Sequence, residues 1–374
     1  MTFYQELQLN QAGSKALIRN IKDPKEKWKH ICIYLFKILL TVAFCVVFVT
    51  IYTKVFGEEN SIVGVVVLLA VMVFRNADLG IKNSHGVLLL AIIYGILAFG
   101  PRISNMVGPF PAFLINVVCI GALMSLGCHN VIMSNHSTFV LGYLLLQGYD
   151  TTGNSYLLRL AGLSVGALAT CFILWRNHRK VHYKRTIRHI FQEFDIHSMR
   201  TRWQIRLTLG VSTAMLFASL IHLPRVMWVG IATMSVLLPF KKDLIERVKY
   251  RAPGNILGGL CFLCLYYLLP ESCYGYIGMI GGIGVGLSAT YGWQAVFNSF
   301  GALSIAMSSF GVAGAIILRV LTNAFGSVYG LLFHNIFESG YNWISEKVFA
   351  KKNCFGELII FELYNYHWYF DLVA

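Results

Sequence analysis

The stretch AIILRVLTNAFGSVYGLLFHN, residues 315–335, is apolar enough to lie in a lipid bilayer, yet Arg319 stands near its start. The stretch YLLRLAGLSVGALATCFILW, residues 156–175, has the same character and carries Arg159 near its start. Both stretches have the length and composition of membrane helices. Because an ionised guanidinium is costly at membrane depth, each arginine is either an interfacial residue or part of a functional site.

The composition of the whole chain agrees with a membrane protein. Of its 374 residues, 56% are hydrophobic and 13% are charged, with a mean hydropathy of +0.62. Soluble domains carry roughly a quarter charged residues, so we predict an all-α, polytopic membrane helical bundle. The first apolar stretch, residues 31–56, is too long for a signal peptide and has no cleavage site, so it should remain as the first membrane helix.

About twelve spans are predicted. The apolar stretches are 31–56, 61–74, 86–100, 109–127, 137–149, 155–175, 205–222, 224–240, 254–269, 273–289, 291–310 and 311–335. A perpendicular helix needs about 20 residues to cross, so the shorter stretches indicate either helices with polar extensions or half-helices. With the N-terminus in the cytoplasm, 26 of the 31 lysines and arginines lie on the cytoplasmic side. This distribution predicts that both termini are cytoplasmic in a cell (inner or plasma) membrane.

The two halves of the chain align weakly. Asp78-Leu79 matches Asp243-Leu244, Lys82 matches Arg247, and Arg159 matches Arg319 in the same order along the spans. This order predicts two parallel six-helix repeats. The predicted segments are a cytoplasmic N-terminal segment 1–30, repeat 1 at 31–175, a basic cytoplasmic linker 176–204, repeat 2 at 205–337 and an interfacial C-terminal tail 338–374.

A set of residues in the second half carries a family resemblance. Its members are Arg206, Pro224, Trp228, Pro239, Arg247, Arg251, Gly254, Gly258, Arg319 and Gly326. In this order and spacing, residues 205–335 resemble the repeat unit of the fusaric-acid-resistance-type membrane proteins, which include aromatic carboxylic acid exporters. The resemblance implies six-plus-six helices, export of aromatic or other hydrophobic organic acids, and a possible homodimer. The plant aluminium-activated malate channels are similar, and they imply an anion channel as the alternative.

The distribution of charges favours an anion as the substrate. All 17 carboxylates fall in termini or loops, and none lies within an apolar stretch. A cation transporter is expected to keep an acidic residue at membrane depth, so the sequence disfavours cation transport. A guanidinium pairs well with a carboxylate at low dielectric, so Arg159 and Arg319 are candidate substrate ligands. The alternative is that each arginine snorkels to the interface or caps a neighbouring helix.

Other candidate residues lie around these two arginines. The segment YGWQAVFNSFG places Gln294 and Asn298 beside Trp293, which would offer amides next to an aromatic face, although interhelical hydrogen bonding explains the same pattern.

The candidate cytoplasmic gate consists of Asp78, Lys82, Asp243, Arg247 and Arg251. The alternative is that Asp78 with Lys82, and Asp243 with Arg247, form local i,i+4 ion pairs. The candidate proton relay consists of His85, His129 and His136, for which interfacial placement without function is the alternative.

From the sequence we therefore expect an integral membrane transporter that exports aromatic or other hydrophobic organic anions. The partners we expect are a small organic anion and membrane lipid. The net charge of +14 is explained by a basic face against anionic lipid, so no nucleic acid is expected. Enzymes need a general base or metal-binding carboxylates near the membrane face, and none is apparent, so we expect no enzyme, cofactor or metal. A membrane enzyme and a non-transporting scaffold are the less favoured alternatives.

Overall fold

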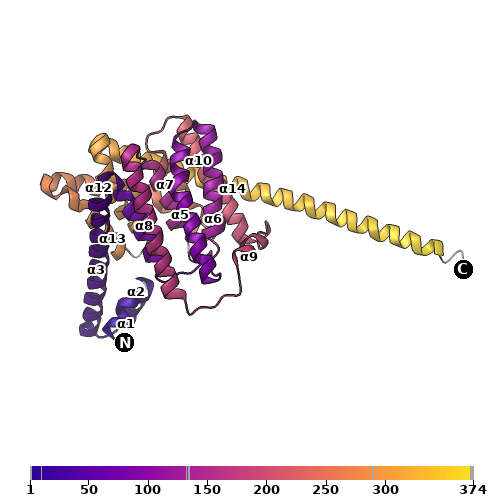
Figure 1. Ribbon diagram of the computed structural model, residues 1–374, viewed down its shortest axis with the longest axis horizontal. Coiled ribbons are helices and arrows are strands. Elements are labelled where there is room, and N and C mark those ends of the chain that lie inside the picture. The colour runs from indigo at the N-terminus through magenta and orange to yellow at the C-terminus, as the bar shows by residue number, and fades with distance from the viewer. Residues whose placement is uncertain (1, 10, 132, 134, 289, 371–374) are drawn as a thin grey trace. The chain divides into compact units, whose positions relative to one another are not determined.

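The computed structural model describes the backbone of residues 2–9, 11–131, 133, 135–288 and 290–370, with side chains except those of residues 11, 12 and 346–370. Every regular element in this part of the chain is a helix, which confirms the all-α prediction (Figure 1). The chain divides into two compact units, residues 1–330 and residues 331–374.

The described part of the first half contains nine helical elements. They are α1 (Phe3–Gln8), α2 (Gln11–Asn20), α3 (Pro24–Phe56), η1 (Glu58–Asn60), α4 (Ser61–Phe74), α5 (Asn83–Asn105), α6 (Pro109–Gly127), α7 (His136–Gly148) and α8 (Gly153–His178). Local sequence explains their ends. The Asp23 side chain accepts hydrogen bonds from the N–H groups of Lys25 and Glu26, and Pro24 occupies the first position of α3.

The linker and the second half contain the remaining elements. They are α9 (Ile187–Gln192), α10 (Met199–Leu220), α11 (Val226–Val236), α12 (Lys241–Leu268), η2 (Glu271–Cys273), α13 (Tyr274–Leu287) and α14 (Tyr291–Phe370). Within α14 the backbone at Gly311 is not helical, with φ 66° and ψ 170°. Glycine adopts a positive φ readily, which explains why this residue stands at the break. The break falls at the boundary between the two spans that the sequence predicts, 291–310 and 311–335.

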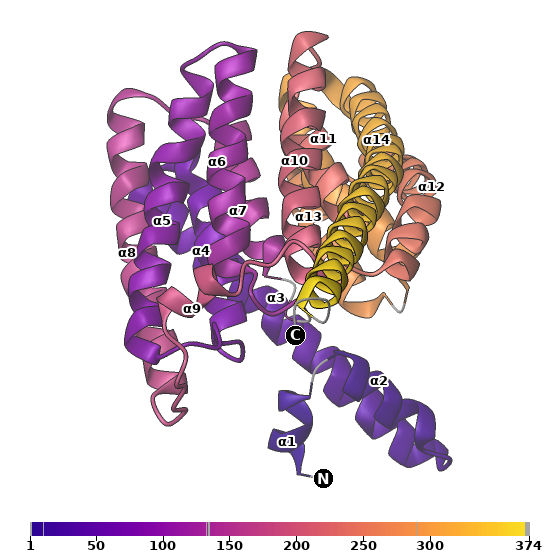
Figure 2. The ribbon, with the colours of Figure 1, turned by 90° about the vertical axis from the view of Figure 1, so that its right-hand side faces the viewer.

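Two groups of helices pack together within residues 1–330. In the first, α4 packs against α3, α7 and α8, and α5 packs against α6, α7 and α8. In the second, α10 contacts α11 and α11 contacts α12, and these helices also meet the first group where α10 packs on α6 and α11 on α7 (Figure 2). Fully buried side chains in these helices include Val63, Leu89, Tyr143, Leu207 and Val229, all less than 1% exposed.

Among the described residues, five helices are long and apolar enough to cross a membrane: Pro24–Phe56, Asn83–Asn105, Pro109–Gly127, Gly153–His178 and Tyr291–Ser345. Helices also occupy the other predicted stretches, but α4, α7, α11 and α13 have only 11 to 14 residues. The twelve spans and the two-repeat layout therefore stay predictions. The predicted tail 338–374 continues α14 as a helix to Phe370, and residues 371–374 lie outside the described residues.

Glycines let the short helices approach their neighbours closely. Gly166 in α8 faces the side chain of Val67 in α4, with no room for a Cβ. Gly326, which stands seven residues after Arg319 as Gly166 does after Arg159, faces α11, where a Cβ would lie 2.6 Å from the Cβ of Ala232. Real Cβ atoms do not approach so closely, so each glycine sets the distance between two helices.

We expect Gly326→Ala to lower the free energy of unfolding by about 1–3 kcal/mol, because the added methyl group overpacks the contact between α14 and α11. Thermal unfolding of the purified protein in detergent checks this. The matched control is Gly301→Ala in the part of α14 before Gly311, where no atom from another helix lies within 4 Å of the added Cβ. Equal melting temperatures for the two variants would show that the close contact is unimportant.

Candidate functional site

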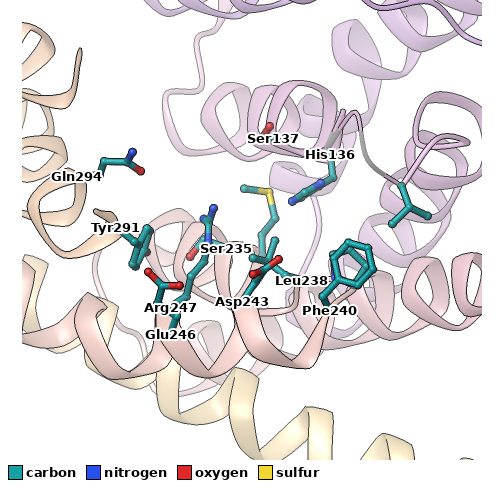
Figure 3. A pocket seen from close by; sticks show the side chains of 13 residues that line it. His136, Ser137, Ser235, Leu238, Phe240, Asp243, Glu246, Arg247, Tyr291 and Gln294 are labelled. Atoms are coloured by element: carbon teal, nitrogen blue, oxygen red, sulfur yellow. The ribbon is translucent and has the colours of Figure 1, made fainter. Parts of the chain in front are cut away.

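A cavity of about 440 Å³ lies between α7 of the first group and the helices α11, α12 and α14. Four elements line it: the start of α7 with His136, the end of α11 with Ser235, the start of α12 with Asp243 and Arg247, and the start of α14 with Tyr291 and Gln294 (Figure 3). Asp243 and Glu246 are exposed, whereas His136 and Ser235 are buried. The cavity therefore has a charged, exposed mouth and a buried interior.

The break between α11 and α12 forms one wall of this cavity. Helix α11 ends at Val236, and the segment LLPF at residues 237–240 separates it from Lys241. Pro239 has no N–H group to continue the helix. Two side chains of α10 hold the break in place: Trp203 Nε1 donates to the Leu237 carbonyl (2.9 Å) and Arg206 Nη2 donates to the Leu238 carbonyl (2.8 Å).

Two arginines of α12 bring positive charge to the cavity. The Arg247 guanidinium lies over the ring of Tyr291, 4.6 Å from its centroid. One helical turn later, Arg251 is only 8% exposed and donates from Nε to Asn323 Oδ1 (2.9 Å) and from Nη1 to the Tyr291 hydroxyl (2.8 Å) and to Ser235 Oγ. These acceptors are all neutral.

Arg319 of α14 lies close to this cluster. It is 7% exposed, and its guanidinium lies 5.0 Å from the ring centroid of Trp228 in α11. Its Nε makes no hydrogen bond to any residue that the structure describes. Asn323 connects the two arginines: its Nδ2 donates to the Arg319 carbonyl (2.7 Å), and its Oδ1 accepts from Arg251 Nε. None of the ion pairs among the described side chains contains Arg251 or Arg319.

Arg159, the aligned arginine of the first half, has different surroundings. It is 2% exposed and donates to three oxygens: Asn60 Oδ1 (3.1 Å), the Leu146 carbonyl (3.2 Å) and the Tyr149 carbonyl (2.5 Å). The last two carbonyls lie at the end of α7, where a cation is favourable. The structure thus places Arg159 as a cap on a neighbouring helix. Whether it also binds substrate stays a prediction.

The predicted gate residues of the first half lie under the linker. Asp78 accepts hydrogen bonds from the Gly80 N–H (2.9 Å) and the Tyr183 hydroxyl (2.6 Å), and the Lys82 N–H donates to the Arg185 carbonyl (2.8 Å). The cavity beside Asp78 measures only about 10 Å³. The connection between α4 and α5 is therefore covered, whereas the connection between α11 and α12 opens into the large cavity.

The three predicted relay histidines lie in three separate places. His85 Nδ1 accepts from the Ile187 N–H (3.3 Å), and His136 lines the large cavity. His129 lies beside Arg185, Arg200 and Glu193, outside the cavity lining. Burial, together with the charges of Arg200 and Arg185, lowers the pKa of His129 to about 4, so its ring is neutral at pH 7.

The predicted aromatic-amide group on α14 is divided. Gln294 lines the cavity, whereas Trp293 and Asn298 lie on the exposed side of the helix. Three neutral partners of Arg251 are absent from the sequence-based candidates: Ser235, Tyr291 and Asn323. Asn323 stands four residues after Arg319 in the stretch quoted first, and a polar residue at membrane depth is a signal that could have identified it.

Comparison with known proteins supports the family resemblance. Residues 213–333 match the family model described as fusaric acid resistance protein-like, which confirms the resemblance in this part of the chain. No curated protein and no solved structure matches the chain. The matched family is a membrane transporter family, and together with the five long apolar helices it supports a multi-pass membrane protein.

Arg159 and Asn60 are expected to stabilise the protein jointly. Arg159→Gln removes the charge from three hydrogen bonds, and Asn60→Ala removes one acceptor, so each should lower the melting temperature. Hydrogen bonds of a charged group contribute about 1.5–3 kcal/mol, so the double variant should lose less than the sum of the two single variants. Strictly additive losses in a thermal double-mutant cycle would contradict a direct interaction.

Protonation of Glu193 is expected to loosen the linker. Burial raises its pKa, but the hydrogen bonds and charges of Arg185 and Arg200 outweigh this and leave the pKa below its usual value. The stabilisation is therefore present above the unfolded-state pKa and is lost as the pH falls through the folded-state pKa. Hydrogen exchange of the α9 amides should accelerate in Glu193→Gln at pH 7. An exchange rate equal to that of the parent protein would refute this role.

Proposed function

We propose that this protein transports aromatic or other hydrophobic organic anions out of the cell, and that the cavity bounded by α7, α11, α12 and α14 receives the anion. The family match indicates a membrane transporter, and the substrate class is our inference from the site. The observation that carries it is the buried guanidinium of Arg251, whose described partners are all neutral, beside a cavity of about 440 Å³.

The chemistry of the lining suits a flat carboxylate. Arg247 at the mouth offers a planar fork of donors that pairs with a carboxylate in two parallel hydrogen bonds. Tyr291 adds an aromatic face and Gln294 adds an amide, while Met234 and Leu238 contribute apolar surface. A substrate with a charged end and an apolar body fits such a mixture better than a small inorganic anion does.

The deeper arginines suggest the onward route. Arg251 lies one helical turn beyond Arg247, and Asn323 links Arg251 to the turn that carries Arg319. An anion could exchange the neutral partners of Arg251 for its own oxygens and then reach Arg319, whose Nε has no described hydrogen-bond partner. Because Arg159 already binds three oxygens, we assign it a supporting role in this route.

An anion channel is the second candidate. The observation that favours it is the placement of the described carboxylates nearest to the cavity, Asp243 and Glu246, at its exposed mouth rather than among the buried arginines. Reconstitution in planar bilayers separates the two functions. A benzoate current of channel magnitude, measured with a benzoate gradient and no other ion gradient, would show that the protein is a channel and not an exporter.

The proposal is tested by uptake of radiolabelled benzoate into proteoliposomes. We expect Arg251→Gln and Arg319→Gln to slow uptake by about 10- to 100-fold, since a hydrogen bond to a charged group contributes about 1.5–3 kcal/mol. The control is Arg179→Gln, an exposed linker residue outside the cavity lining.

The melting temperature of each variant shows whether it is folded, and Arg319→Lys tests charge without the planar fork. Transport at the parental rate by both folded glutamine variants, across a panel of aromatic carboxylates, would exclude this route.

A further inference from the structure

One buried histidine lies in the cavity without a complete set of partners. His136, the first residue of α7, is 3% exposed, and its Nδ1 makes no hydrogen bond to any residue that the structure describes. Figure 3 shows its side chain directed into the cavity from the wall formed by α7, whereas Arg247 enters from α12. Its ring meets Trp203 of α10 edge-on, with centroids 5.1 Å apart, so packing fixes its orientation.

The charges around His136 determine its protonation. From α12, Asp243, Glu246 and Arg247 line the same cavity, and Tyr291 of α14 also lines it. Two more cations lie near the wall: Arg251 donates to Ser235, and Arg206 of α10 donates to the Leu238 carbonyl. In the empty cavity, burial and the neighbouring arginines both oppose a charged imidazole, because an imidazolium would be desolvated and would face like charge.

A bound carboxylate reverses this balance. Its negative charge offsets Arg247, and its oxygens accept a hydrogen bond from a protonated ring nitrogen. His136 lines the cavity, so its protonated ring can donate a hydrogen bond to a carboxylate that is bound there. The same ligand thus stabilises the charged form that the empty cavity disfavours.

We propose that His136 takes up one proton when a carboxylate binds in the cavity, so that the protein binds the organic anion and a proton together. This inference rests on the proposed function and adds the form in which the substrate is carried. The proton comes from water at the mouth of the cavity and is held on the imidazole, and no covalent bond of the substrate is made or broken. The pair carries no net charge, so it is equivalent to one molecule of the neutral acid.

Linkage gives the proposal a quantitative signature. If one proton is taken up with each anion, the Kd for benzoate rises about tenfold for each unit of pH over the range in which His136 is neutral in the empty cavity. If no proton is taken up, the Kd does not depend on pH in the range where benzoate itself stays ionised. With one proton taken up, His136 would convert a change in pH at the cavity mouth into a change in affinity for the anion.

The experiment measures proton uptake by the purified, full-length protein in detergent. Benzoate at pH 7 is added in a weakly buffered solution that contains a pH indicator, and bound benzoate is counted in parallel. We expect close to one proton per benzoate in the parent protein and close to none in His136→Gln, in which the Kd also becomes independent of pH. The matched control is His182→Gln in the linker, which should retain the parental uptake.

The possible results separate this inference from the proposed function. Benzoate binding without proton uptake would overturn the role of His136 and leave anion transport intact. Uptake that persists in His136→Gln but disappears in Asp243→Asn would assign the proton to the carboxylate and overturn the inference as well. Failure of the parent protein to bind any aromatic carboxylate would overturn the proposed function and, with it, this one. If His136→Gln does not fold, two measurements still test the role of His136: the pH dependence of the parental Kd and the proton uptake of Asp243→Asn.

Discussion

Buried guanidinium groups must find hydrogen-bond acceptors in a bundle whose apolar stretches contain no carboxylate, and the arrangement of the helices follows from this requirement. Arg159 uses the carbonyls at the end of α7, and Arg206 uses a carbonyl in the break between α11 and α12. Arg251 uses an amide and two hydroxyl groups. Each of these arginines therefore joins segments that are distant in the sequence, and each needs an irregular or polar piece of a helix beside it.

Arg319 differs from Arg159 and Arg251 because its Nε makes no hydrogen bond to any residue that the structure describes. Its guanidinium lies on the face of Trp228, which offers attraction to the charge but no lone pair to Nε. The aligned position in the first half, Arg159, is filled by structural acceptors, and the linker covers the adjoining connection through Tyr183 and Arg185. The first half thus has the features of a scaffold, whereas the second half keeps a cavity and an incompletely bonded cation.

The sequence predicts the helices well where hydropathy is the main signal. The predicted stretch 137–149 corresponds to α7 at 136–148, and the predicted division of α14 falls at Gly311. Hydropathy fails at polar extensions: α12 begins at Lys241, although its apolar part begins near residue 254. It also overestimates α11, which ends at Val236 because the segment that follows contains Pro239.

Only part of the candidate site could be predicted. Helical spacing alone places Arg247 and Arg251 on one face of α12, and the family resemblance draws attention to both. Their partners could not be inferred in this way, because Asn323 lies 72 residues from Arg251 and Tyr291 lies 40 residues away. Such contacts depend on how α11, α12 and α14 pack, and no local pattern in a single sequence carries that information.

The shared amide of Asn323 means that the two arginines cannot rearrange independently. A ligand that draws Arg251 out of its present geometry leaves the Asn323 oxygen without its donor. The nitrogen of the same amide is held on the Arg319 carbonyl, so the released oxygen stays on the turn next to a guanidinium that still has a free N–H. A ligand at Arg251 would therefore leave an unpaired acceptor on the turn that carries Arg319.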